Sequence, residues 1–263
     1  MQRHVTYFFA CLAVVLTAGT AAAQDRSLDA AAAQKLFAAP PRAYATAPLW
    51  VWNDMLTDEQ IRGTMRDLAS QKVRQVFVHP RPGLMTPYLS DEWFRLWKVA
   101  LDEAETLDMN VWIYDENSYP SGFAGGHVPE IMPESRGRGL VLRDAQGVPQ
   151  LGPDTLAIYR VQPDGLENVT QQVRGGQTLP DAQYVVASVV RAGNSPWHGD
   201  RSYVDLMYPG VTEKFLEVTL EPYKRHIGDQ FGKRVLGAFT DEPNVAPAGG
   251  LPWTDQLPAV FQQ

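Results

Sequence analysis

The residues best suited to acid–base chemistry are the acidic and amide side chains that follow the short apolar runs of the chain. Two of these runs end in an Asp-Glu pair, at Asp115-Glu116 and at Asp241-Glu242. In glycoside hydrolysis one carboxyl group protonates the leaving oxygen, while a second attacks the sugar or activates water. Burial and mutual repulsion raise the pKa of such an acid, so that it keeps its proton near neutral pH. The two pairs therefore favour paired-carboxylate chemistry on a sugar.

The other candidates stand at the same place, where an apolar run gives way to polar residues. In parallel βα barrels the active site is built at the carboxyl ends of the strands. Asp and Asn are also common at strand ends because they stabilise turns, where they tolerate the backbone geometry and bond their own backbone. For any single residue this structural role remains an alternative to catalysis or binding. Side chains alternate along a strand, so one of Asp241 and Glu242 is expected to face the pocket while the other braces a neighbour. The candidate substrate-binding residues are Trp52, Asn53, His79, Asp115, Asn117, Tyr119 and Asp241.

Aromatic side chains gather near the same strand ends, and aromatic faces pack well against the C–H surfaces of sugars. Tyr119 and Phe123 lie in a loop rich in Gly and Pro, where a core role is less natural. Core filling is the favoured interpretation for Trp50, Trp52 and Trp112, because these residues lie within apolar runs. A carbohydrate ligand is thus supported mainly by the loop aromatics.

Other chemistries are disfavoured by what the motifs lack. The loop at residues 120–126 has neither the lysine nor the spacing of a phosphate-binding loop, although its glycines would let backbone N–H groups approach a ligand. A zinc hydrolase on a βα barrel would need His-x-His on the first strand, where this chain has Trp50-Val51-Trp52. No metal-ligating set is identified, and a hard cation such as calcium, held by Asp and Asn oxygens, remains open.

The elements that must position these residues follow a parallel βα rhythm. Buried strands are predicted at residues 49–54, 73–78 and 109–114, and amphipathic helices at 57–72 and 90–107. Residues 139–190 instead alternate like antiparallel strands. The βα rhythm then resumes with a fourth strand at 203–207, a helix at 212–231, a fifth strand at 234–240 and a helix starting near residue 254.

This pattern predicts an α/β fold, namely a partial (β/α)8 barrel of about five βα units with an inserted antiparallel β module. The expected boundaries are a leader at residues 24–47, the first three βα units at 48–135, the β module at 136–200 and the remaining units at 201–263. Five strands are too few to close an eight-stranded barrel and would leave open edges. The chain is therefore expected to be truncated at its C-terminal end.

The N-terminus and the composition bear on location and partners. Arg3, an apolar run and Ala21-x-Ala23 form the pattern of a secretory signal peptide over residues 1–23, cleaved after about Ala23. A secreted or bacterial periplasmic protein follows, with no membrane association after cleavage.

The chain has 23 Lys and Arg against 30 Asp and Glu, a net charge of −7 and no basic run, which disfavours nucleic acid as a partner. Its single cysteine, Cys11, rules out an internal disulfide.

Three stretches carry a resemblance to a known family. They are the opening Leu49-Trp50-Val51-Trp52-Asn53, the block from Tyr114 to Gly122 with Gly125-Gly126, and the segment from Gly237 to Pro243. Together they resemble the N-terminal part of the catalytic region of glycoside hydrolase family 106, the α-L-rhamnosidase-like enzymes. The resemblance runs from about Pro48 to the end of the chain, apart from the β module. The enzymes of that family have much longer chains.

The resemblance implies a catalytic (β/α)8 barrel that removes terminal deoxysugars from an oligosaccharide or glycoside, with inversion and with calcium near the site. Matched residue by residue, Glu242 is implied to be a catalytic carboxylate in the role of general acid. Glu116 is implied to bind sugar or to act as the partner carboxylate. The function expected is thus that of a secreted glycosidase, represented here by an N-terminal fragment. The alternative is a carbohydrate-binding or barrel-remnant protein without catalysis.

Overall fold

The structure is a computed structural model that describes residues 29–262. The predicted signal peptide lies outside the described residues, so its cleavage and the secreted location stay predictions. The chain divides into two units between Pro40 and Pro41. In the first unit the predicted leader contains a helix, α1 (Ala30–Ala38), which begins where the Asp29 side chain accepts a hydrogen bond from the Ala32 N–H at 2.7 Å.

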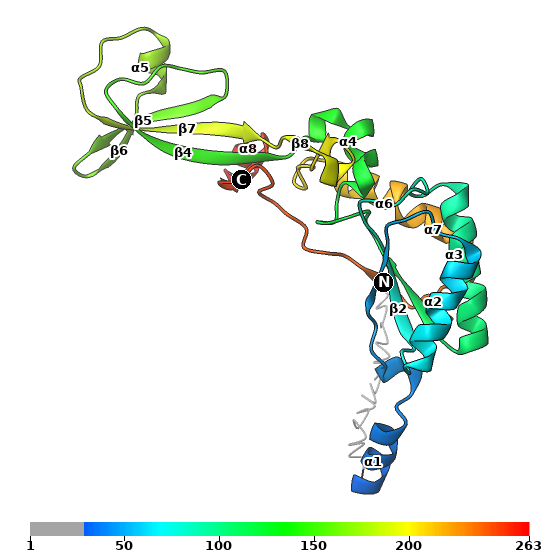
Figure 1. The fold of residues 1–263 in the computed structure, drawn as a ribbon. Helices are drawn as coiled ribbons and strands as arrows, with labels where there is room; N and C mark the ends of the chain where they lie inside the picture. Colours follow the sequence, from blue (N-terminus) through cyan, green and yellow to red (C-terminus); the bar gives the residue numbers. More distant parts are fainter. Residues whose placement is uncertain (1–28, 263) are drawn as a thin grey trace, which may run out of the picture. The chain divides into compact units, whose positions relative to one another are not determined.

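The second unit contains a parallel sheet of four strands (Figure 1). The strands are β1 (Leu49–Trp52), β2 (Gln75–Pro80), β3 (Asn110–Tyr114) and β10 (Ala238–Phe239), and they lie in the order β1-β2-β3-β10. All three pairings are parallel. The predicted first three strands are confirmed, and the predicted fifth strand is present as the short β10, which pairs with β3.

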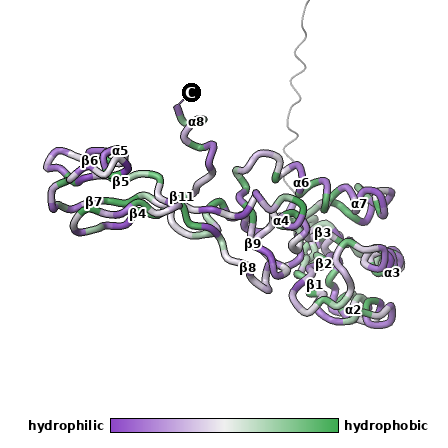
Figure 2. The backbone as a smooth tube through the Cα atoms, turned by 90° about the horizontal axis from the view of Figure 1, so that it is seen from above, coloured by the Kyte–Doolittle hydropathy of each residue, from purple (hydrophilic) through white to green (hydrophobic). Residues whose placement is uncertain are grey.

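Two helices cover one face of this sheet. Helix α2 (Asp58–Ser70) starts with a capping box, in which Thr57 and Gln60 each accept a hydrogen bond from the other's N–H. Helix α3 (Asp91–Leu107) starts at Ser90, whose hydroxyl accepts from the Trp93 N–H at 3.2 Å. In Figure 2 both helices alternate between hydrophilic and hydrophobic residues, as expected of helices that bury one side.

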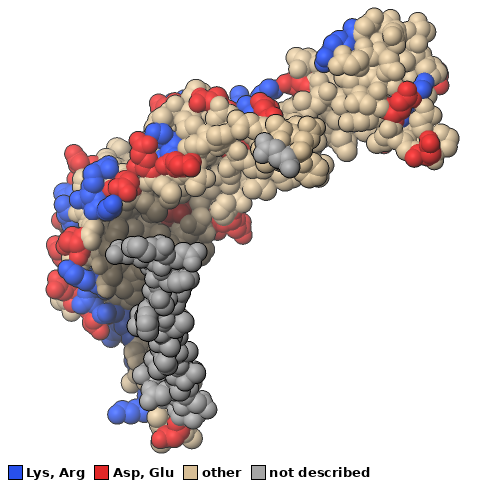
Figure 3. All heavy atoms as spheres, turned by 180° about the vertical axis from the view of Figure 1, so that it is seen from behind, with Lys and Arg blue, Asp and Glu red and all other residues tan. Residues whose placement is uncertain are grey.

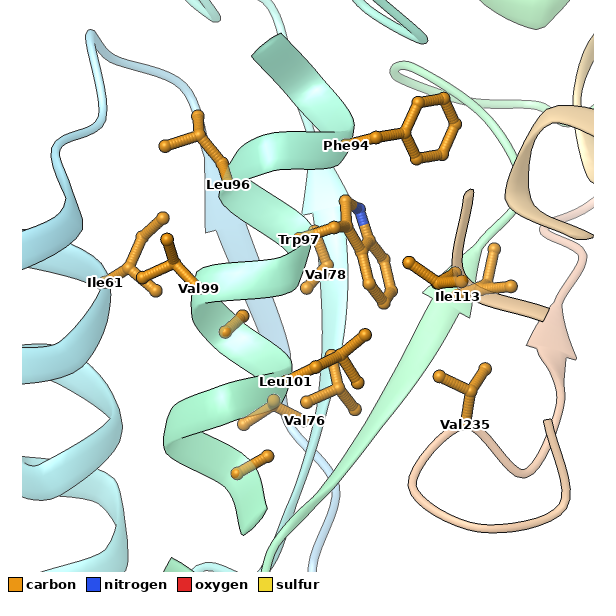
Figure 4. Close-up of a cluster of buried hydrophobic side chains, with 14 of the residues drawn as sticks. Ile61, Val76, Val78, Phe94, Leu96, Trp97, Val99, Leu101, Ile113 and Val235 are labelled. Carbon is orange, nitrogen blue, oxygen red and sulfur yellow. The ribbon is translucent and has the colours of Figure 1, made fainter. Parts of the chain in front are cut away.

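The main core lies between these helices and the sheet (Figure 4). In that view Trp97 and Leu101 of α3 point toward Val76 and Val78 of β2 and toward Ile113 of β3. The fully buried Val76, Val78 and Trp97 are typical of its members. Each large apolar side chain removed from water in this way contributes about 1.5–3 kcal/mol, so the core fixes the register of β1 to β3 and hence the positions at which these strands end.

The predicted fourth parallel strand is wrong. Residues 203–207 form no strand of the parallel sheet, and Val204 instead makes an isolated antiparallel bridge with Arg136. The Asp205 side chain accepts a hydrogen bond from the Met207 N–H at 3.0 Å, a local turn that ends the extended segment. The apolar residues that suggested a buried strand belong to a second small core, which includes Phe123, Tyr203 and Val204.

The predicted helix at 212–231 is divided. It consists of α6 (Val211–Val218), α7 (Leu220–Ile227) and the 3-10 turn η5 (Gly228–Gln230). Pro222 lacks an N–H to donate to the preceding turn and its ring crowds that turn, so the helix breaks at Thr219 and restarts with Pro222 in its first turn.

The predicted β module is an antiparallel sheet of five strands in the order β11-β4-β7-β5-β6. Its strands are β4 (Arg138–Gln146), β5 (Thr155–Gln162), β6 (Gly165–Asn168), β7 (Gln183–Arg191) and β11 (Leu251–Pro252). The prediction placed the end of the module at residue 200, but β11 comes from the C-terminal segment and pairs with Gly139 and Leu140 of β4. A small core that includes Ile158, Val169 and Tyr184 packs against this sheet.

Short elements lie between the two sheets in the sequence, namely α4 (His127–Ile131) and the paired strands β8 (Asn194–Ser195) and β9 (Arg201–Ser202). Helix α5 (Thr170–Arg174) lies between β6 and β7, and α8 (Leu257–Phe261) follows β11. The fold is therefore mixed α/β, with a parallel sheet of βα units and a separate antiparallel sheet. About five barrel strands were predicted, and four are present.

Candidate active site

The loop that follows β3 is organised around the carboxylate of Glu116. This side chain is fully buried. One oxygen, Oε2, accepts hydrogen bonds from the N–H groups of Gly122, Phe123 and Ala124 at 2.7–3.0 Å. The other, Oε1, accepts from the N–H groups of Asn117 and Gly125. The loop from residue 117 to 125 thus wraps around a single carboxylate.

The environment of Glu116 determines what this residue can do. Burial raises its pKa to about 8, although the N–H donors act in the opposite direction. Both oxygens are engaged by the backbone of the loop, so the carboxyl group has no exposed surface on which a sugar could bind. This geometry favours a role in shaping the loop. The implied contact of Glu116 with substrate stays a prediction.

Asp115, at the end of β3, joins the ends of two strands. It is almost fully buried, and Oδ1 accepts from the Ser121 hydroxyl at 2.6 Å while Oδ2 accepts from the Thr240 hydroxyl at 2.5 Å. The Ser121 hydroxyl in turn accepts from the Asp241 N–H at 2.8 Å. Burial raises the pKa of Asp115, and the Ser121 and Thr240 hydroxyls lower it. The two Asp-Glu pairs of the sequence are therefore brought together through Ser121.

His79, Tyr114 and Asp241 form a second part of the cluster. The Tyr114 hydroxyl donates to Asp241 Oδ2, and the rings of His79 and Tyr114 lie edge to face with centroids 3.7 Å apart. His79 is fully buried. Burial and the neighbouring Arg81 lower its pKa to about 4, while Asp241 acts in the opposite direction. His79 is therefore a neutral imidazole near pH 7.

Arg81, which the sequence analysis did not single out, extends this cluster. Its Nε–H donates to Nε2 of His79. Its Cζ lies 5.3 Å from the centroid of the Tyr119 ring and 5.4 Å from that of Trp197, within the range of cation–π contacts. Arg81 follows His79-Pro80 directly at the end of β2, but it is a cation and therefore falls outside the pattern of acidic and amide residues at strand ends.

The remaining predicted residues are more scattered. Trp52 is fully buried in the main core next to Trp93, as expected of a core residue. It has no accessible surface through which it could make the predicted contact with substrate. Asn53 is exposed, and its backbone carbonyl lies against Gly83, where an added Cβ would come within 2.7 Å of the oxygen. Asn117 is half-buried within the Glu116 loop.

Glu242 lies just beyond Asp241 and is exposed. Its backbone has a φ of 42°, in the left-handed region that costs a residue with a side chain about 1–2 kcal/mol. Strain of this kind is concentrated at functional sites. The Asp241 carboxylate accepts a hydrogen bond from Tyr114 whereas Glu242 is exposed, so the two members of the pair differ in environment. Which of them faces a substrate stays a prediction.

The described residues give no support for a metal centre. They contain no group of three or more His, Asp or Glu side chains placed to hold an ion. The carboxylate oxygens nearest the strand ends already accept hydrogen bonds from Ser121, Thr240 and Tyr114. This donor set does not fit the implied calcium site, because calcium needs six to eight free oxygen ligands.

Two further features concern partners. In the part of the chain from residue 29 to 262, no helix is both long and apolar enough to cross a bilayer. On the face seen in Figure 3, Lys and Arg side chains are interspersed with Asp and Glu.

Comparison with known proteins adds a likeness of fold. No family model matches the chain, and no curated protein matches its sequence. A solved structure, the rhamnosidase from Novosphingobium sp. PP1Y, matches with a TM-score of 0.56 and 14% sequence identity. The match covers 87% of this chain and 41% of that one, so the chain spans less than half the length of that rhamnosidase. The chain is thus similar in fold to part of a rhamnosidase.

Proposed function

We propose that the chain is part of a glycoside hydrolase that removes terminal deoxysugars such as L-rhamnose from glycans. The observation that carries the proposal is the meeting of two Asp-Glu pairs at the carboxyl edge of a parallel sheet, in a fold similar to part of a rhamnosidase. In βα folds this edge is where catalytic residues are found. Hydrolysis at this edge also accounts for the concentration of buried polar groups there.

In the proposed reaction Glu242 is the general acid. It would give its proton to the glycosidic oxygen as the bond to the sugar breaks. Water would add its hydroxyl group to the anomeric carbon and release its second proton to solvent, from which Glu242 is protonated again. The place of Glu242 directly after β10, beside Asp241, and its strained backbone support this role. Asp241 would bind the sugar, held in place by its hydrogen bond from the buried Tyr114 hydroxyl. Glu116 would act on the reaction through the loop it holds.

The test is turnover by the purified chain against a panel of 4-nitrophenyl glycosides that includes the α-L-rhamnoside. Glu242→Gln keeps the shape of the side chain and removes the proton donor, so turnover is expected to fall about 100-fold or more. Glu213→Gln, a change at another exposed glutamate in α6, is the matched control and is expected to retain turnover. Urea unfolding of both variants checks that they fold alike.

Equal turnover in the wild type and in Glu242→Gln would refute the role of Glu242. Absence of turnover in the wild type on every glycoside would refute catalysis by this chain.

A second candidate is carbohydrate binding without cleavage. It is favoured by Trp197, whose side chain is 36% exposed beside Tyr119 and Arg81, because partly exposed aromatic rings are suited to stacking on sugars. Titration of the chain with L-rhamnose, followed by tryptophan fluorescence, tests it. Saturable binding that is unchanged in Glu242→Gln, in the absence of turnover, would select this function over hydrolysis.

A further inference from the structure

The guanidinium of Arg81 is held at the carboxyl edge of the parallel sheet by three neighbours. Nε–H donates to His79, and the rings of Tyr119 and Trp197 lie 5.3 and 5.4 Å from Cζ. The two aromatic residues are themselves fixed, since Trp197 Nε1–H donates to the Tyr119 carbonyl at 2.6 Å and their rings meet edge to face at 5.5 Å. The cation is therefore preorganised.

The charge of this guanidinium is not neutralised by the described part of the chain. Among residues 29–262, no Asp or Glu oxygen lies within 4.0 Å of Arg81. Only its Nε has a hydrogen-bond partner in that part of the chain. The terminal nitrogens Nη1 and Nη2 form an edge that fits a carboxylate with two parallel hydrogen bonds.

The acidic groups nearby already have donors of their own. Asp115 is bonded to Ser121 and Thr240, Asp241 to Tyr114, and Glu116 to five backbone N–H groups. These carboxylates therefore form hydrogen bonds within the protein, while the terminal nitrogens of Arg81 remain available to a ligand. The neighbouring rings of Tyr119 and Trp197 would pack against the apolar face of a sugar.

We propose that Arg81, Tyr119 and Trp197 form a subsite for a sugar that bears a carboxylate, so that the substrate of the proposed hydrolase is an acidic glycan. The inference rests on the proposed function, because it assigns the substrate class of the same strand-end site. The carboxylate binds Nη1 and Nη2 of Arg81, and the sugar ring stacks on the exposed side chain of Trp197, which Tyr119 holds in place.

The test compares D-glucuronate with D-glucose, which differ at one carbon by a carboxylate. Binding to the purified chain is followed by tryptophan fluorescence and calorimetry, and sodium acetate at equal ionic strength provides a carboxylate without a sugar ring. Glucuronate is expected to bind at least about tenfold more tightly than either glucose or acetate, since a charge-assisted pair of hydrogen bonds supplies that factor.

Arg81→Gln removes the charge and is expected to abolish the preference for glucuronate over glucose. Arg81→Lys keeps the charge but loses the planar fork, so the preference is expected to fall to an intermediate value. Arg143→Gln, which removes an exposed arginine from β4, is the matched control and is expected to bind as the wild type does. Thermal unfolding of each variant confirms that it is folded.

Equal binding of glucuronate and glucose, equal binding of glucuronate and acetate, or a preference that survives in Arg81→Gln would each overturn the proposal. Failure to bind any of the three would overturn it as well. The proposed hydrolysis is judged separately, because it depends on turnover of a neutral aryl rhamnoside and its loss in Glu242→Gln. Failure of the subsite and failure of the proposed hydrolysis can therefore be told apart.

Discussion

The buried His79 should make the protein less stable in mild acid. Its pKa is lowered to about 4 in the folded state, first by burial and then by Arg81, from an ordinary value of 6.5. An unfolded chain exposes the imidazole to water and restores the ordinary value. Below pH 6.5 the unfolded state therefore takes up a proton that the folded state does not accept until about pH 4, and stability is lost as the pH falls through this window.

The size of the effect follows from the two pKa values. At pH 7 the imidazole is mostly neutral in both states and contributes little. At pH 5 it is almost fully protonated in the unfolded state and mostly neutral in the folded state, which lowers the free energy of unfolding by about 2 kcal/mol relative to pH 7. The full loss, reached below pH 4, is about 3 kcal/mol.

Urea unfolding at pH 7, 6 and 5, followed by tryptophan fluorescence, measures this loss. Burial also raises the pKa values of Asp115 and Glu116 near the site. The wild type is therefore compared with His79→Gln, in which those carboxyl groups remain and the imidazole is absent. The wild type is expected to lose about 2 kcal/mol more than the variant between pH 7 and pH 5. The C2–H resonance of His79 should titrate with a midpoint near pH 4.

The reasoning is refuted if the wild type and His79→Gln lose the same free energy over this range. A His79 resonance that titrates near pH 6.5 would refute it independently, because it would place the folded and unfolded pKa values together.

Two further predictions concern stability. Glu116→Ala leaves five loop N–H groups without their acceptor, so the free energy of unfolding measured by urea titration should fall by about 3 kcal/mol or more. The control Glu105→Ala, at an exposed site in α3, should change this free energy by about 0.5 kcal/mol or less. Gly139→Ala would place a Cβ 1.9 Å from the Gly249 carbonyl oxygen and should detach β11 from β4, so that amide hydrogen exchange at Leu251 becomes faster. In the control Gly193→Ala the added Cβ meets nothing within 4 Å, and the exchange rate at Leu251 should stay unchanged.

The parallel part of the fold could be predicted because its signals are local. The capping box at Thr57, the cap at Ser90 and the apolar runs before Asn53 and Asp115 each specify an element through residues adjacent in the chain. The strand predicted at residues 203–207 was wrong because an apolar run indicates that residues are buried but not which residues they pack against. Tyr203 and Val204 are buried, but against Phe123 and not within the parallel sheet.

The candidate site was only partly accessible to the same reasoning. The βα rhythm placed Asp115 and Asp241 at strand ends, but with a fourth strand between them. In the structure β3 pairs directly with β10, and Ser121 joins the two residues. The difference between Asp115-Glu116 and Asp241-Glu242 could not be read from the sequence. It depends on the loop folding back so that its N–H groups surround Glu116, while Glu242 stays exposed. The contact of Arg81 with Trp197 joins segments far apart in the chain, so it could not be predicted from residues adjacent in the sequence.

The bridge from Asp115 to Thr240 also has a consequence for the order of folding. These residues are 125 positions apart in the chain, and the whole antiparallel sheet except β11 is encoded between them. The hairpin of β5 and β6 closes over a few residues and can form early, whereas the pairing of β3 with β10 must wait for a long loop to close. The strand-end cluster is then among the last parts of the chain to assemble, and a nascent chain would complete it only after β10 has been synthesised and docked.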